Sequence, residues 1–129
     1  MYGIEVVTPA SGRPVSAADL RAHLRLNDDS EDTQLEEWID AAAERFELDT
    51  RRPVLATVYR QSFRVWPADG VIVLGRGGVS AVGGVTRRLA DGTDASVTGW
   101  ASDLTTAPAR VVLGTVPDLI DHANGYTVT

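Results

Sequence analysis

The sequence predicts an α+β fold: two N-terminal helices followed by an antiparallel β region of about five or six strands. Two observations predict this fold. Apolar residues recur with the period of a helix as far as residue 52, and beyond Pro53 the period changes to two, as in half-buried strands. All the helical pattern precedes the strand pattern, so the two kinds of element are segregated rather than alternating.

The N-terminal stretch, residues 1–15, contains two prolines and no apolar periodicity, so we expect an extended arm. Ser16 then offers an N-cap hydroxyl, and Asp19 follows three positions later. This pattern predicts a short helix over about residues 17–26. The turn-forming run 27–30 ends it, because these side chains compete with the backbone for hydrogen bonds.

A second helix is predicted from near Glu31. Its apolar positions recur at intervals of three and four residues and form one stripe, and acidic residues lie on the other side. The stripe consists of Leu35, Trp38, Ile39, Ala42 and Phe46. The acidic side consists of Glu36, Glu37, Asp40 and Glu44. Pro53 closes the segment, so residues 16–52 form the helical part.

Residues 53–129 form the β-rich part, and we expect both parts to belong to one structural domain. Alternation and turn residues predict strands at 55–65, 71–74, 79–89, 95–100, 110–113 and 126–129. Gly83-Gly84 indicates a bulge or a close backbone approach, and Asp91-Gly92 is a hairpin signal. The glycine-rich run 75–78 indicates a flexible link.

Composition excludes several kinds of protein. The chain has 129 residues, a formal net charge of −6 and no cysteine, so it has neither disulfides nor a thiolate zinc site. The longest purely aliphatic run, 71–74, is far shorter than a membrane helix, and the start MYGIEVV lacks the signal-peptide pattern. We therefore expect a soluble protein.

Residues suited to catalysis are few. The two histidines are His23, in the first helix, and His122, in a loop, and we expect both to be ordinary surface or partly buried side chains. No metalloprotease, hydrolase-elbow or P-loop motif is present. The acidic run 28–32 lacks the glycine and closing glutamate of a calcium loop, and a strand pattern rather than a helix follows the glycines at 75–78. We expect no enzyme, cofactor or metal site; carboxylate-based catalysis stays open because the chain has 18 acidic residues.

Nucleic-acid binding requires clustered basic residues, because affinity comes mainly from neutralised phosphates. Here the arginines are spread along the chain and the net charge is negative. A local patch stays open, because Arg60 and Arg64 share a face of the first predicted strand and Arg87 and Arg88 are adjacent. We expect the three tryptophans to pack in the core or an interface.

A longer pattern joins the two helices to the first strand. It comprises a Pro-x-Ser cap, a short helix ending in Leu-Arg, an acidic loop, a helix with Ile-x-x-Ala and a late Glu, then an Arg and a strand. In this chain it runs through Pro14, Ser16, Leu24-Arg25, Asp28 to Asp32, Ile39, Ala42, Glu47, Arg52, Tyr59 and Phe63. The pattern resembles the N-terminal region of phage head-tail connector proteins, the small adaptors beneath the portal of long-tailed phages and gene transfer particles. With the later stretch LGRGGVSAVGGVTRRLADGT, the resemblance covers about residues 14–100.

The resemblance implies a structural protein of the virion, assembled in the cytoplasm of a bacterial host. It implies a ring matched to the twelvefold portal, which extends the DNA channel and joins head to tail. The implied partners are the portal protein, neighbouring copies of the chain, and the next connector, stopper or tail component. DNA passes through without sequence-specific binding, and no membrane is involved. A negative subunit is compatible with such a channel, because phosphate contacts would arrest sliding.

A ring requires two different complementary surfaces on each subunit. The candidates are the acidic side of the second helix and the arginines of the first strand: Glu36, Glu37, Asp40, Glu44, Arg60 and Arg64. Two separately solvated faces are the alternative reading.

The sequence departs from the family in two places. Arg51 stands where a small residue is usual before the motif's arginine, which puts the turn after the second helix in doubt. Longer relatives continue into C-terminal helices that contact the portal, whereas this sequence ends at Thr129, so we expect either a short form or part of a longer gene product. The alternative function is a non-virion α+β module that binds a protein partner.

Overall fold

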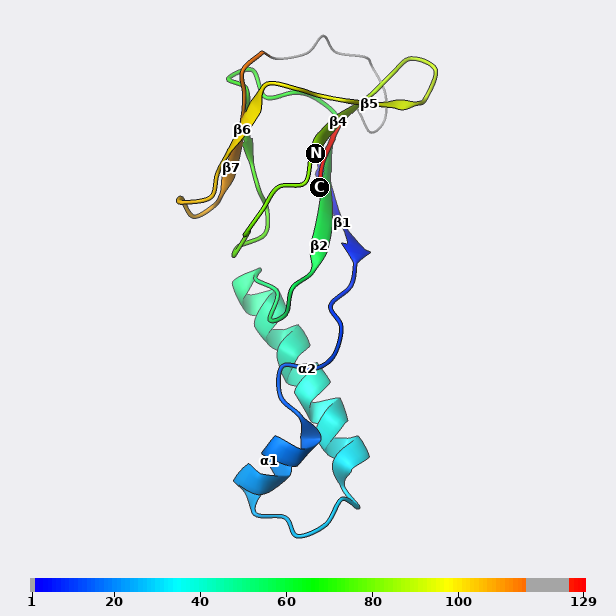
Figure 1. Ribbon diagram of the computed structural model, residues 1–129, viewed down its shortest axis with the longest axis vertical. Helices are drawn as coiled ribbons and strands as arrows, with labels where there is room; N and C mark the ends of the chain where they lie inside the picture. The colour runs from blue at the N-terminus through cyan, green and yellow to red at the C-terminus, as the bar shows by residue number, and fades with distance from the viewer. Residues whose placement is uncertain (1, 116–125) are drawn as a thin grey trace. The chain divides into compact units, whose positions relative to one another are not determined.

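The computed structural model describes residues 2–115 and 126–129, which divide into two compact units. One unit, residues 10–56, contains both helices (Figure 1). The other unit, which runs up to Pro9 and resumes at Thr57, contains the strands. The predicted α+β class is confirmed. In the described part of the chain, no helix combines the length and the apolar character needed to cross a membrane.

The helical unit contains α1 (Ala17–Leu24) and α2 (Asp32–Thr50), as predicted. The predicted N-cap is also present, because the Ser16 hydroxyl accepts a hydrogen bond from the backbone N–H of Asp19 at 3.1 Å. This bond satisfies one of the amides that the first turn of a helix leaves without an intrahelical partner.

The apolar stripe of α2 is only partly buried. Leu35 and Ile39 are 1% and 8% exposed, as predicted, whereas Trp38 is 58% exposed and Phe46 is 48% exposed. Ala42 is exposed as well. The predicted apolar stripe is therefore not buried along its whole length. The reason is length, because α1 has eight residues and spans about 12 Å, too short to cover the 19 residues of α2.

Both helices end in arginines with left-handed backbone conformation. Arg25 has φ 58° and Arg51 has φ 55°. The Arg51 amide donates to the carbonyl of Glu47 at 2.9 Å, which closes the last turn of α2. Glycine adopts this conformation without steric cost, whereas a side chain raises its energy by about 1 kcal/mol. The turn after α2 is thus an ordinary left-handed cap, although a small residue is usual at the position of Arg51 in the family that the sequence resembles.

The strands form two antiparallel sheets. The five-stranded sheet has the order β1-β2-β8-β4-β5, with bounds Tyr2–Thr8, Val58–Phe63, Tyr126–Val128, Val85–Arg88 and Asp94–Ser96. The three-stranded sheet has the order β3-β7-β6, with bounds Val71–Val73, Arg110–Leu113 and Trp100–Asp103.

The described residues contain eight strands, more than the predicted five or six. The additional N-terminal strand, β1, lies in the stretch expected to be an arm and pairs antiparallel with β2. The predicted strand 95–100 is divided between the two sheets, because Gly99, with φ +74°, separates β5 from β6. The predicted strand 79–89 begins only at Val85.

Two local glycine predictions are confirmed. The amides of Gly83 and Gly84 both donate to the carbonyl of Thr129, at 2.6 and 3.2 Å, and a Cβ at Gly83 would lie 3.3 Å from that oxygen. The close backbone approach is therefore real. Gly92 adopts φ +85° in the turn that joins β4 to β5, as the Asp-Gly hairpin signal predicts.

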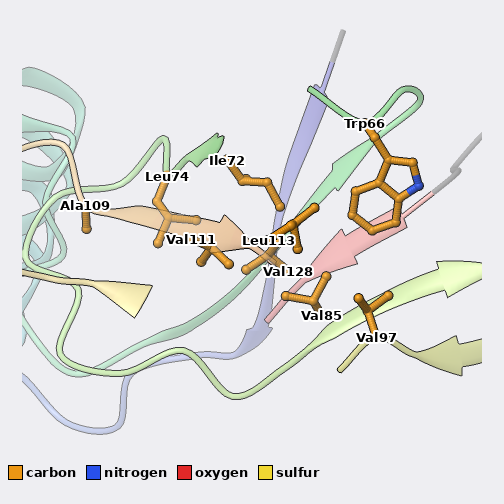
Figure 2. Packing of buried hydrophobic residues seen from close by; sticks show 9 residues of the cluster. All are labelled: Trp66, Ile72, Leu74, Val85, Val97, Ala109, Val111, Leu113 and Val128. Atoms are coloured by element: carbon orange, nitrogen blue, oxygen red, sulfur yellow. The ribbon is translucent and has the colours of Figure 1, made fainter. Parts of the chain in front are cut away.

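The hydrophobic core of the β unit contains side chains from both sheets (Figure 2). Its buried members are Trp66, Ile72, Leu74, Val85, Val97, Ala109, Val111, Leu113 and Val128. The expectation of packed tryptophans holds for Trp66, which is buried, and for Trp100, which packs against the core while partly buried.

One polar side chain, Gln61, is buried in this unit and is only 6% exposed. Its Nε2 donates to the carbonyl of Val73 at 3.0 Å, and its Oε1 accepts from the amide of Gly75 at 2.8 Å. Gln61 thus links β2 of one sheet to β3 of the other. It also holds the start of the glycine-rich link 75–78, in which the Arg76 guanidinium lies 5.3 Å from the centroid of the Tyr59 ring.

Candidate functional site

The acidic side of α2 is partly neutralised within the subunit. Arg13 binds Asp40 through two hydrogen bonds, from Nε at 2.8 Å and Nη2 at 3.0 Å, and its Nη1 lies 3.2 Å from Glu36. The hydrogen bond from Arg13 lowers the pKa of Asp40, since it favours the charged carboxylate. Two of the four predicted acidic residues are therefore paired with the segment that precedes α1.

The other two acidic residues carry no counter-charge. Glu37 accepts a hydrogen bond from Gln34 at 3.1 Å, and Glu44 is exposed. Neither forms an ion pair with another described residue. On the acidic side of α2, the negative charge without a described counter-charge therefore lies at these two positions.

The predicted arginine face of the first strand is only partly formed. Arg60 lies on β2, and its Nη1 is 3.2 Å from the carboxylate of Glu5, its cross-strand neighbour on β1. Arg64 follows the last residue of β2, so the structure does not place it on the strand itself. Arg64 is exposed and takes part in a further interaction.

The solvent-facing side of the five-stranded sheet carries a polar surface that sequence reasoning missed. Cross-strand neighbours place a row of hydroxyl side chains across four strands. The row consists of Ser62, Thr127, Thr86 and Ser96. The alternation of Ser and Thr with apolar residues was the available signal, but it becomes a row only once the strands are paired in register.

Two ion pairs border this hydroxyl row, and together with Ser62, Thr86 and Thr127 they line a hollow. One is Glu5 with Arg60, and the other is Arg88 with Asp94 on the β4–β5 hairpin. Arg87 has the opposite strand parity to Arg88, so it projects from the other face of the sheet. The open prediction of a joint arginine patch is therefore wrong for this pair, and two of the four arginines are neutralised by carboxylates.

The remaining candidate residues are the two histidines and the acidic run 28–32. His23 is exposed on α1, and His122 lies outside the described residues. In the acidic run, Asp28 accepts hydrogen bonds from the amide and the hydroxyl of Ser30, and these bonds lower its pKa. In residues 2–115 and 126–129, no three histidine, aspartate or glutamate side chains converge closely enough to hold a metal ion.

Exposed apolar side chains on α2 form another feature that the sequence analysis missed. Trp38, Phe46 and Leu48 are exposed, although the first two belong to the predicted apolar stripe. The helical stripe shows which residues are apolar, but it cannot show how much of that stripe a neighbouring helix covers.

Comparison with protein families confirms the resemblance seen in the sequence. Residues 16–72 match the family described as phage gp6-like head-tail connector protein. The matched segment begins at the N-cap of α1 and extends to the start of β3. No curated protein matches the chain.

Solved structures share the fold over nearly the whole chain. One is a chain from the neck of an empty gene transfer agent particle computed with C6 symmetry: it is 23% identical, with a TM-score of 0.77, over 98% of this chain and 68% of that one. Another is from the virion of a native gene transfer agent particle: it is 22% identical, with a TM-score of 0.79, over 97% of this chain and 68% of that one. The fold of this chain therefore also occurs in solved structures.

Proposed function

We propose that this chain, which matches the phage gp6-like head-tail connector family over residues 16–72, is a structural connector between the head and the tail of a phage-like particle. The family match is the observation that carries the proposal, because it covers both helices and β2 in one continuous stretch. The shared fold with chains of a gene transfer agent neck and virion supports the same role.

Within this role, the chain forms a ring beneath the portal, extends the DNA channel and presents a platform for the next connector, stopper or tail component. A ring of twelve copies matches a twelvefold portal and is also compatible with a sixfold axis, the symmetry with which the gene transfer agent neck was computed. The net charge of −6 fits a channel through which DNA slides without being held. The chain acts in the virion and is assembled in the bacterial cytoplasm, with no catalytic step.

Adjacent subunits of the ring meet through the acidic side of α2 on one copy and the arginine face on the next. Of the four acidic residues on this side of α2, Glu37 and Glu44 form no ion pair with another described residue, so a neighbour can neutralise them. Arg60 contacts Glu5 through a single nitrogen, and a guanidinium has five N–H donors, so most of its donors can serve a second carboxylate. Arg64, just beyond the end of β2, extends this face.

Charge reversal tests this interface, and its first step, on α2, breaks no described ion pair; the compensating step removes the pair between Arg60 and Glu5. Glu37→Arg with Glu44→Arg is expected to abolish ring assembly on the portal, and a further Arg60→Glu with Arg64→Glu is expected to restore it. The matched control is Asp29→Arg with Glu31→Arg, which changes the net charge equally at two other exposed positions of the helical unit. Normal assembly of the first variant would remove these surfaces from the interface and leave two solvated faces.

The connector role itself is tested by deleting the gene in a particle-producing strain. We expect DNA-filled heads and separate tails that do not join, and restored joining when the gene is supplied from a plasmid. Joined particles of normal infectivity or transfer activity in the deletion strain would reject the role. They would favour the alternative of a protein-binding module that is not part of the virion.

A further inference from the structure

The N-terminal strand β1 is an unusually separable part of its sheet. It lies at one end of the strand order and pairs with β2 alone. None of its described side chains belongs to the hydrophobic core, and only Ile4 is half-buried. For the residues Gly3 to Thr8, the side-chain contact given between the two strands is the ion pair between Glu5 and Arg60. Detaching this part of β1 therefore exposes little apolar surface.

The segment between β1 and α1 is an exposed linker that can adopt different backbone conformations. Residues 9–15 are all exposed, and no backbone hydrogen bond among the described residues restrains them. The segment contains Pro9 and a left-handed Gly12, with φ +77°. Immediately afterwards, Arg13 is fixed to α2 by its contacts with Asp40 and Glu36. The stretch from Pro9 to Gly12 is thus a short hinge between a strand and an anchored point.

From the separable strand, the short hinge and the anchor, we infer that β1 is exchanged between neighbouring copies of the ring. In the assembled connector, β1 leaves its own sheet and pairs with β2 of the adjacent copy. The inference rests on the proposed connector function, because it requires a ring. The strand that pairs with the β2 edge therefore comes from a second copy of this chain.

Strand exchange conserves the local interactions. The same cross-strand register forms between copies, from Tyr2 opposite Phe63 to Thr8 opposite Val58, and Glu5 again meets Arg60. Domain swapping has a low energetic cost for this reason, since each bond broken within a copy is remade with its neighbour.

Exchange also supplies the geometry that a ring needs. Each copy donates a strand on one side and accepts a strand at the β2 edge on the other, so the two contact surfaces differ and the contact is heterologous. When the ring closes, no β2 edge is left without a partner. The hinge spans roughly 15 Å when fully extended, so the strand can reach only an adjacent copy.

Engineered disulfides distinguish exchange from pairing within one copy, and the natural chain has no cysteine to interfere. The test pair is Gly3→Cys with Ser62→Cys, which are direct cross-strand neighbours on β1 and β2. Position 3 has room for a side chain, because nothing lies within 4 Å of an added Cβ. The matched control is Thr86→Cys with Ser96→Cys, direct neighbours in the β4–β5 hairpin.

Each variant replaces the natural gene in a particle-producing strain, and purified particles are oxidised and then denatured without reductant. For the test pair, we expect covalent multiples of the 13.8 kDa chain on a denaturing gel, and for the control pair a single chain. Reduction is expected to collapse the ladder to one band. The highest rung would also report the number of copies in the ring.

Single chains from the test pair, with both thiols oxidised, would show that β1 stays in its own copy; unreacted thiols would show that it lies beside neither β2. Either result overturns the exchange and leaves the connector role intact. Absence of the natural chain from particles would reject both. If the test variant alone fails to assemble, the pair Thr8→Cys with Val58→Cys gives the same readout at the exposed end of the two strands.

Discussion

The link between the two sheets depends on Gln61, and its replacement by leucine tests that dependence. Leucine has a side chain of similar volume, but it cannot form either of the two hydrogen bonds. The carbonyl of Val73 and the amide of Gly75 then lose the partners they have at 3.0 and 2.8 Å. Each partly buried backbone group left without a partner costs about 1–3 kcal/mol, and the added apolar burial returns about 1 kcal/mol. Gln61→Leu is therefore expected to lower the free energy of unfolding by about 1–5 kcal/mol.

Urea unfolding measured by tryptophan fluorescence would give this quantity, because Trp66 is buried in the same unit and reports its opening. In thermal unfolding, a loss of about 3 kcal/mol, in the middle of this range, corresponds to a Tm lower by about 10 °C. The control is Gln34→Leu on α2, which removes an exposed hydrogen bond to Glu37 and should change stability by less than about 0.5 kcal/mol. A Gln61→Leu variant as stable as the natural protein would refute the argument that the two backbone groups depend on this side chain.

Three further substitutions probe other features. Gly114→Ala should destabilise the β unit by about 1–3 kcal/mol, measured by urea unfolding, because the new Cβ would lie 2.7 Å from a backbone oxygen. Arg51→Gly should stabilise the helical unit by about 1 kcal/mol in thermal unfolding followed by circular dichroism, since glycine adopts the left-handed cap without steric cost. Hydrogen bonds from Thr105 and then Arg110 lower the pKa of Asp103 from 3.8 to about 2. Because the unfolded chain takes up this proton first, the stabilisation is complete above about pH 4 and is lost as the pH falls towards 2, and Asp103→Asn should flatten that part of the stability–pH curve.

Each of these predictions has a result that contradicts it. Gly84→Ala is the control for the first, because nothing lies within 4 Å of its added Cβ, and equal losses at both positions would rule out the clash. A less stable Arg51→Gly variant would show that interactions of the arginine side chain stabilise the protein by more than the left-handed conformation costs. An unchanged acid limb in Asp103→Asn would mean that this carboxylate does not contribute to acid unfolding.

Short sequence patterns predicted the elements that are stabilised by interactions between residues close together in the chain. The Ser16 cap, the two helices and the Asp91-Gly92 hairpin are set by residues within a few positions of one another, and all three are confirmed. The exposed Trp38 was not predictable in the same way, because its burial depends on how far α1 extends along α2.

The candidate site depends on long-range pairing, which is why sequence reasoning located its residues but not their partners. The ion pair between Arg60 and Glu5 spans 55 positions, and the one between Arg13 and Asp40 spans 27. Strand β1 was missed for the same reason, since its short apolar alternation becomes recognisable only beside β2. Gln61 has the strand parity of the apolar residues, but no pattern shows which backbone groups it binds.

The copy number of the chain in intact particles tests the connector role most directly. DNA-filled particles would be purified by density, and quantitative mass spectrometry would compare this chain with the portal protein. A structural connector ring matched to the portal predicts nearly equal copy numbers. Absence of the chain from intact particles would contradict the account.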